Sequence, residues 1–244
     1  MGRLTEAVKH LIIINVILFI VPQFAPAIGL DSLFALYFPK NPNFGFWQFL
    51  THMFMHGGFA HILFNMYGLY AFGTPLEQMW GRNKFLFFYF SAGLGAGAIY
   101  TFANYYQFNG VYEQLMSIGL NATEIQNILD TGKYSTDILN YLSEKDLSEF
   151  YGTYHTPAVG ASGAIYGILV AFGLSFPNAK LALIFFPVPI AAKYFIPAII
   201  IGDLFFGMTK YSIGNVAHFA HVGGALIGFI IAWYWKQNQF KRWD

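Results

Sequence analysis

The sequence predicts an all-α membrane protein, a polytopic bundle of six transmembrane helices with a small helical insert between the third and the fourth. Hydrophobic residues make up 56% of the 244-residue chain and charged residues only 10%, whereas about a quarter of the residues in a soluble domain are charged. Apolar segments near the bilayer-crossing length of about 20 residues occur at 10–27, 50–73, 85–106, 157–175, 194–209 and 214–235. One polar stretch, 107–155, interrupts them. We therefore expect a single membrane domain over residues 1–244, with the lipid bilayer as its solvent.

The first apolar segment has a second interpretation. Arg3 and Lys9 precede an apolar run, and Ala25-Pro26-Ala27 has some likeness to a signal-peptide cleavage site. A proline between the two alanines argues against cleavage. We therefore expect this segment to remain as the first span.

The insert 107–155 is acidic and has helix-start signals. Asn121-x-x-Glu124 and Ser143-x-x-Asp146 have the pattern of a capping box, in which side chains bind the free backbone N–H groups of a helix N-terminus. We expect two or three short helices that form an outward-facing cap. An acidic amphipathic insert need not touch the substrate, so we interpret it as a solvated spacer.

The distribution of basic residues predicts the orientation. With both termini in the cytoplasm, only four of the thirteen Lys and Arg residues lie outside, namely Lys40, Lys133, Lys145 and Lys210. The segment Leu181 to Ala192 is too short and too rich in proline to span, and we place it at the cytoplasmic surface. The site described next would then open outward.

Composition excludes several kinds of function. The chain has no Cys, which removes disulfides, thiolate zinc sites and a Cys nucleophile. The net charge of +1 comes with no basic tract for a phosphate backbone, so nucleic acid is not an expected partner. No His-Glu-x-x-His motif occurs. We expect neither a metal nor a cofactor.

Ser162 and His221 are the candidate catalytic residues. Each lies in an apolar segment, where a polar side chain is costly and points to function. An imidazole beside a serine hydroxyl can take its proton as a base and return it to a leaving amine as an acid. His218 lies one turn before His221, and one of the two histidines has a structural role on this interpretation.

Glycines predict how these two residues meet. Gly160, Gly163 and Gly167 form a stripe on the fourth segment, and Gly224 and Gly228 form a matching one on the sixth. Stripes of small residues let two helices approach closely. Asp203 is the only acidic residue in the six apolar segments, and nothing in the sequence places it beside Ser162 or His221. We therefore expect a Ser-His dyad with no third carboxylate.

Further polar residues lie on the second segment. His61 and Asn65 are spaced i, i+4, so both project from one face of a helix as hydrogen-bond donors suited to an oxyanion. His52 and His56 form a second i, i+4 pair nearer the outer surface, where they would hold water or cap a polar funnel.

Simpler interpretations stand beside this one. A glycine stripe with one serine is often only a helix-packing surface. In another interpretation, five histidines ligate heme or a metal in a non-enzymatic carrier, namely His52, His56, His61, His218 and His221. This hypothesis leaves Ser162 and Asn65 unexplained.

The motifs resemble those of the rhomboid intramembrane proteases. The resemblance is carried by Gly160-Ala161-Ser162-Gly163 with Tyr166, by Ala220-His221-x-x-Gly224-x-x-x-Gly228, and by His52-x-x-x-His56 followed by His61-x-x-x-Asn65. It covers the chain apart from the insert and the termini. Glycines at the third and seventh positions after the histidine match His221 rather than His218.

The resemblance implies a serine endopeptidase that cuts single-span membrane proteins near the outer face. Ser162 is then the nucleophile and His221 the general base, while His61, Asn65 and the Ser162 backbone N–H stabilise the oxyanion. Tyr166 is the aromatic residue that packs on the imidazole. The implied location is the inner membrane of a bacterium. The alternative within the resemblance is an inactive rhomboid-like chaperone that binds spans without cutting them, although such proteins typically lack the nucleophile or the base.

Two features depart from the family pattern. Many bacterial rhomboids carry a Trp-Arg pair in the first outer loop, but residues 28–48 contain no Arg and have Trp47-Gln48 instead. The family pattern therefore does not indicate how that loop is seated in the membrane. The insert 107–155 is also longer than the usual connection at this place.

Overall fold

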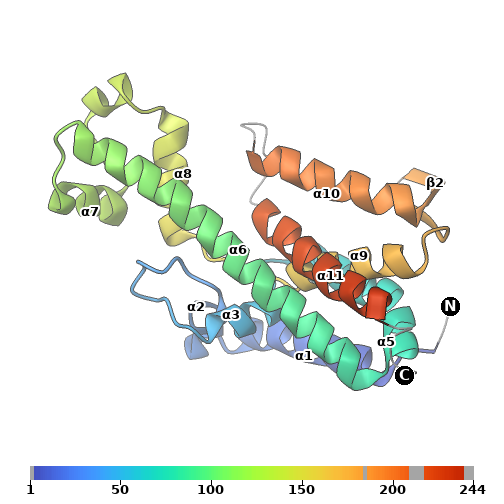
Figure 1. Ribbon diagram of the computed structural model, residues 1–244. Coiled ribbons are helices and arrows are strands. Elements are labelled where there is room, and N and C mark those ends of the chain that lie inside the picture. The colour runs from blue at the N-terminus through green and yellow to red at the C-terminus, as the bar shows by residue number, and fades with distance from the viewer. Residues whose placement is uncertain (1–2, 184–185, 209–216, 239–244) are drawn as a thin grey trace.

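Helices form most of the chain in the computed structural model (Figure 1), which describes residues 3–183, 186–208 and 217–238. In chain order the helical elements are α1 (Glu6–Phe24), η1 (Pro26–Ile28), α2 (Leu30–Phe34), α3 (Gln48–Thr51), η2 (His52–Phe54), α4 (Phe59–Gly68), η3 (Leu69–Gly73), α5 (Thr74–Trp80), α6 (Arg82–Ser117), α7 (Ala122–Thr131), η4 (Thr136–Asn140), α8 (Glu144–His155), α9 (Ser162–Ser175), α10 (Ala192–Met208) and α11 (His218–Asn238).

Three helices of the described residues are long and apolar enough to cross a membrane, namely α1, α6 and α11. α9 is apolar but has only 14 residues. The expected fifth and sixth spans fall on α10 and α11, although residues 209 and 214–216 lie outside the described part of the chain.

Two helices begin later than hydropathy predicts. The expected segment 50–73 starts in short helices and a turn, and α4 begins only at Phe59. The segment 157–175 starts in extended backbone, and α9 begins at Ser162. Hydropathy reports that a segment is apolar, but it does not separate a helix from an irregular segment that other helices bury.

The segment after α9 is a hairpin, so the all-α expectation misses a small sheet. β1 (Lys180–Leu183) pairs antiparallel with β2 (Phe186–Ala191), with Leu181 opposite Ile190. Both strands of a two-stranded sheet are edge strands, where proline is tolerated because one side of each strand needs no partner. The expectation that this stretch does not form a spanning helix is confirmed.

A buried carboxylate from α5 holds the start of α1. Glu77, 5% exposed, accepts the backbone N–H groups of Ala7 at 2.8 Å and Val8 at 2.9 Å. The first N–H groups of a helix have no partner within it, and a negative charge is favourable there. Glu77 thereby links the start of α1 to α5, the helix that follows α4 and η3.

The insert is built on an extension of α6. This helix runs for 36 residues, well past the expected end of the third span, and Figure 1 shows α7 and α8 at the end remote from α5. Both expected helix starts are confirmed, because Asn121 with Glu124 and Ser143 with Asp146 form capping boxes at α7 and α8.

The insert has its own hydrophobic core and packs on the connection between α2 and α3. Phe108 of α6 stacks on Phe150 of α8 at 4.3 Å between ring centroids, and it also meets Phe38 of that connection at 4.5 Å. The Asn41 side chain donates to the Tyr154 carbonyl at 2.8 Å. The interpretation as a solvated spacer is therefore incomplete, because the insert also holds this connection in place.

Gln48 organises the same connection from the other side. Its side chain, 0% exposed, donates to the Leu33 and Asn43 carbonyls and accepts the Tyr37 backbone N–H. The Trp47 indole N–H donates to the Leu33 carbonyl at 2.9 Å. A neutral amide, with donors and an acceptor in one group, therefore satisfies three backbone groups of this connection.

We predict that Gln48→Leu destabilises the fold. The change removes the part-buried hydrogen bonds to the Tyr37 N–H and the Asn43 carbonyl, and an intramolecular hydrogen bond typically contributes about 0.5–1.5 kcal/mol. The thermal unfolding midpoint in detergent measures the effect. Gln23→Leu is the matched control, since Gln23 makes one exposed side-chain hydrogen bond, to the Phe19 carbonyl. Equal midpoints for the two variants would contradict the role of Gln48.

Candidate active site

Ser162 is the first residue of α9 and follows an extended segment. Ala158 in this segment forms an antiparallel bridge with Leu36, and the Gly160 N–H donates to the His52 carbonyl at 2.9 Å. The first N–H groups of a helix lack partners within it. Ser162 therefore presents its hydroxyl beside backbone N–H groups that have no partner within α9, rather than from the interior of a helix as expected.

Gly160 is required for a reason other than helix packing. Its φ is +124°, which L side chains rarely adopt, and a Cβ there would lie 2.7 Å from His61 Nε2 and 3.6 Å from Ser162 Oγ. The expected helical stripe that included Gly160 is wrong, because α9 begins two residues later. The missing side chain instead leaves open space between His61 and Ser162.

His221 lies beside Ser162. The Nε2 atom of His221, on α11, is 2.9 Å from Ser162 Oγ, and both residues are partly buried. This is the distance for transfer of the hydroxyl proton to the imidazole. The structure thus brings together the two residues that the sequence analysis singled out, which are 59 positions apart.

The glycines set this distance. A Cβ on Gly224 would overlap the Gly163 carbonyl group, and one on Gly228 would lie 2.5 Å from the Gly167 Cα. The backbones of α9 and α11 are therefore in direct contact, as the two stripes predicted. A larger residue at any of these positions would force the helices apart and Ser162 away from His221.

Tyr166 packs on the face of the His221 ring. The ring centroids are 4.2 Å apart and the planes are 10° from parallel. Tyr166 lies one turn after Ser162 on α9, so the same helix carries the hydroxyl and the stacking ring. This contact restricts rotation of the imidazole about its own axis.

Asp203 of α10 joins the site, which differs from the expectation that no carboxylate does. Its Oδ1 is 3.2 Å from His221 Nδ1 and 2.7 Å from His218 Nδ1, and the Tyr166 hydroxyl donates to its Oδ2. The expectation failed because a sequence does not show which face of α10 meets α9 and α11. A lone acid in an apolar segment was the available signal.

His61 and Asn65 lie on α4 one turn apart. The Gly57 N–H donates to His61 Nδ1 at 3.4 Å, which leaves Nε2 of a neutral ring as the protonated nitrogen, facing the space beside Gly160. Asn65 is 6% exposed, and its Nδ2 has no hydrogen-bond partner among the described residues. Both side chains therefore offer donors that the described part of the protein does not use fully.

His52 and His56 do not form the expected helical pair. η2 ends at Phe54, and Met55 is extended, so the two histidines separate. His52 is buried, its Nδ1 donates to the Gln48 carbonyl at 2.8 Å, and its own carbonyl holds Gly160. The His56 ring lies 5.0 Å from the His61 ring, between centroids. His52 thus positions the segment before Ser162, whereas His56 lies next to His61.

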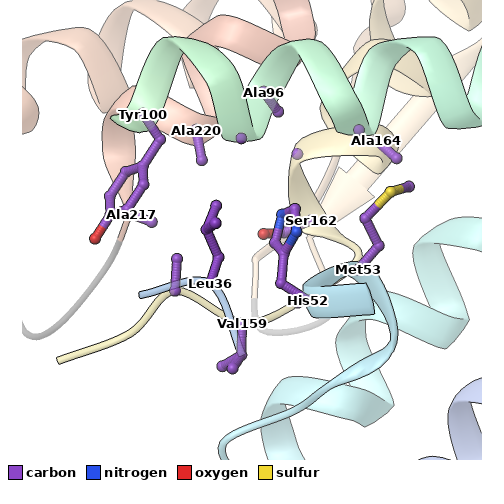
Figure 2. Close-up of a pocket in the computed structure, with 15 residues that line it drawn as sticks. Leu36, His52, Met53, Ala96, Tyr100, Val159, Ser162, Ala164, Ala217 and Ala220 are labelled. Carbon is purple, nitrogen blue, oxygen red and sulfur yellow. The ribbon is translucent and has the colours of Figure 1, made fainter. Parts of the chain in front are cut away.

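A narrow pocket opens beside Ser162 (Figure 2). His52 and Ser162 line this pocket together with Ala96 of α6, Ala164 of α9, Leu36 and Val159, all of which Figure 2 labels. Most of its lining residues are small, among them Gly93, Ala96, Gly97, Gly163, Ala164 and Ala220. Such a lining leaves room for a small group rather than a large side chain.

The described residues contain no group of three or more His, Cys, Asp or Glu that could hold a metal ion. The five histidines of the heme or metal hypothesis are divided between the region around α4 and the start of α11. That the protein needs no metal or cofactor remains a prediction.

Known proteins that are similar to this chain are named rhomboid proteins or rhomboid proteases, and each shares a low percentage of identical residues with it. The chain is 26% identical to Rhomboid protein 1, mitochondrial, of Saccharomyces cerevisiae, over 74% of this chain and 39% of that protein. It is 27% identical to Rhomboid protease GluP of Bacillus subtilis, over 76% of this chain and 25% of the relative. Rhomboid protease AarA of Providencia stuartii is 26% identical, over 76% and 54%. The chain thus matches only part of the length of these relatives.

The match to the family extends over both halves of the site. The Rhomboid domain profile covers residues 43–122 and 131–238, which include the α4 histidine and asparagine, Ser162, Asp203 and His221. The gap between the two ranges falls inside the insert, which is the departure noted in the sequence. Because the matched ranges make up well over half of the chain, this protein belongs to the rhomboid family.

Proposed function

We propose that this protein is an intramembrane serine endopeptidase, with Ser162 as nucleophile and His221 as general base. The observation that carries the proposal is the 2.9 Å distance between Ser162 Oγ and His221 Nε2. Membership of the family, in which relatives are named rhomboid proteases, supports the same conclusion.

The geometry supports acyl transfer in two stages. Ser162 Oγ attacks the scissile carbonyl carbon while its proton passes to His221 Nε2, and the imidazolium then returns that proton to the leaving amine as the C–N bond breaks. A water molecule attacks the resulting ester by the same route. His221 takes its proton, and the serine hydroxyl is restored as the acid product leaves.

The negative charge of the tetrahedral intermediate falls in the space beside Gly160. We assign its stabilisation to His61 Nε2, the Asn65 side-chain amide and the backbone N–H of Ser162. Donors that are fixed before the reaction stabilise developing charge without reorganising. The positive φ of Gly160 and its missing side chain keep this space open.

The substrates we propose are single-span membrane proteins cut near the outer face of the membrane. The small residues that line the pocket beside Ser162 favour a small side chain before the scissile bond. A helix buries its carbonyls in hydrogen bonds, so the cut segment must unwind before it can present one to Ser162.

Family membership makes this a multi-pass helical membrane protein. We propose six spans, on α1, the run from α4 to α5, α6, α9, α10 and α11, with both termini in the cytoplasm. The asymmetry of Lys and Arg supports this orientation. The insert then lies outside, and the proposed location is a bacterial inner membrane.

Replacing either member of the pair tests the mechanism. We expect Ser162→Ala and His221→Ala to reduce cleavage of a single-span substrate to background, because each removes an atom that takes part in bond making or proton transfer. Turnover in liposomes is the measurement. Ser175→Ala, at the other end of α9, and His10→Ala, exposed on α1, are matched controls that retain activity. Substantial turnover by either site variant refutes the proposal.

A second test concerns the oxyanion donors. Loss of one donor typically lowers kcat about 10²–10³-fold; since several donors share the charge here, we expect about 100-fold or less for Asn65→Ala and more for the double variant with His61→Ala. The loss falls on kcat rather than KM. Asn83→Ala, exposed on α6, is the control. Unchanged kcat in the double variant removes both residues from the mechanism.

Topology is testable by labelling, because the chain has no Cys of its own. Cysteine introduced at Thr136 in the insert is expected to react with an impermeant maleimide added to intact cells. Cysteine at Asn83, at the start of α6, reacts only after the cells are opened. Both positions are exposed. The reverse pattern would place the insert in the cytoplasm and overturn the direction of access.

A further inference from the structure

Two charged side chains are buried in the described part of the protein, and only one is explained by the fold. Glu77 is bound by two backbone N–H groups at the start of α1. Asp203, 9% exposed, has three side-chain partners, and all three belong to or adjoin the site: Tyr166, His218 and His221. A carboxylate in a membrane-spanning segment is costly, so its partners indicate its role.

The contact with His221 selects a tautomer. An ionised carboxylate only accepts hydrogen bonds, so Nδ1 of His221, 3.2 Å from Asp203 Oδ1, must carry the proton. In a neutral imidazole Nε2 then has a free lone pair, and Nε2 is the atom 2.9 Å from Ser162 Oγ. In the other tautomer an N–H would face the serine, and the ring could not take its proton.

The three partners also fix the carboxylate itself. Each oxygen of a carboxylate can accept two hydrogen bonds; Oδ1 receives both histidines and Oδ2 receives the Tyr166 hydroxyl. Tyr166 in turn stacks on the His221 ring. Asp203 therefore contacts the edge of the His221 imidazole, and the Tyr166 ring packs on its face. Asp203 also binds the hydroxyl of that tyrosine.

We propose that Asp203 is a positioning residue that keeps His221 in the Nδ1–H tautomer and faces its Nε2 toward Ser162. The inference rests on the proposed serine protease function and adds a third group to it. As His221 gains the serine proton, the negative charge of Asp203 also stabilises the imidazolium, as the aspartate does in serine protease triads. The competing role is purely structural, in which Asp203 only links α10 to α9 and α11.

The test compares Asp203→Asn and Asp203→Leu with the wild type. Asn keeps the shape and one acceptor but loses the charge, whereas Leu keeps the branching at Cγ, is larger, and loses every hydrogen bond. We expect kcat to fall in the order wild type, Asn, Leu, by about tenfold or more for Asn, with KM within about threefold because substrate binding is untouched. Thermal midpoints and the folded fraction are measured on the same samples.

A fluorophosphonate probe supplies a readout that needs no transmembrane substrate. It forms an O–P bond with an activated serine hydroxyl and releases fluoride, so its rate of reaction with Ser162 reports activation by His221. We expect this rate to fall in parallel with kcat. Glu77→Gln is the control for a buried acid with a structural role, since it is expected to lower the thermal midpoint while kcat per folded molecule stays unchanged.

The outcomes separate the two proposals. If Ser162→Ala is inactive but Asp203→Asn keeps the wild-type kcat and labelling rate, the positioning role is overturned and the protease function stands. The same conclusion follows if Asp203→Asn behaves as Glu77→Gln does, with loss of stability alone. If Asp203→Leu does not fold, Asp203→Asn decides. If Ser162→Ala itself cleaves substrate, the protease mechanism fails first.

Discussion

Direct backbone contact between α9 and α11 is the constraint on which the site depends. Gly163, Gly167, Gly224 and Gly228 leave no side chain between the two helices, and a methyl group at Gly224 would overlap a carbonyl of the other helix. Within a membrane, packing of this kind is a main source of helix association, since lipid is as apolar as the side chains. The distance between the serine and the imidazole is a product of this packing.

Orientation needs more than proximity, and it comes from other elements. The extended segment before α9 is tied to η2 through the His52 carbonyl and to the connection after α2 through Leu36, so the start of α9 is fixed from two sides. Gln48 and the insert hold that connection. Groups far from Ser162 in sequence therefore determine where its helix begins.

Much of this arrangement could be predicted from the sequence. Hydropathy located most of the helices, and capping boxes located α7 and α8. The resemblance to the rhomboid motif, through its glycine register, selected His221 as the histidine that meets Ser162. The failures share a cause. His52 and His56, Gly160 and Asp203 were interpreted as if each apolar segment were one regular helix seen alone. Their roles depend on where a helix actually starts and on which helix lies opposite, and these are tertiary facts that periodicity does not contain.

The unbroken length of α6 has a structural consequence. At a rise of about 1.5 Å per residue, its 36 residues extend for about 54 Å, whereas the hydrocarbon core of a bilayer is about 30 Å thick. The first half of this helix places Ala92 and Ala96 against the α9 glycines, and the second half carries Phe108 and Leu115 in the core of the insert. One continuous helix, longer than that core is thick, therefore joins the packing beside the start of α9 to the core of the insert.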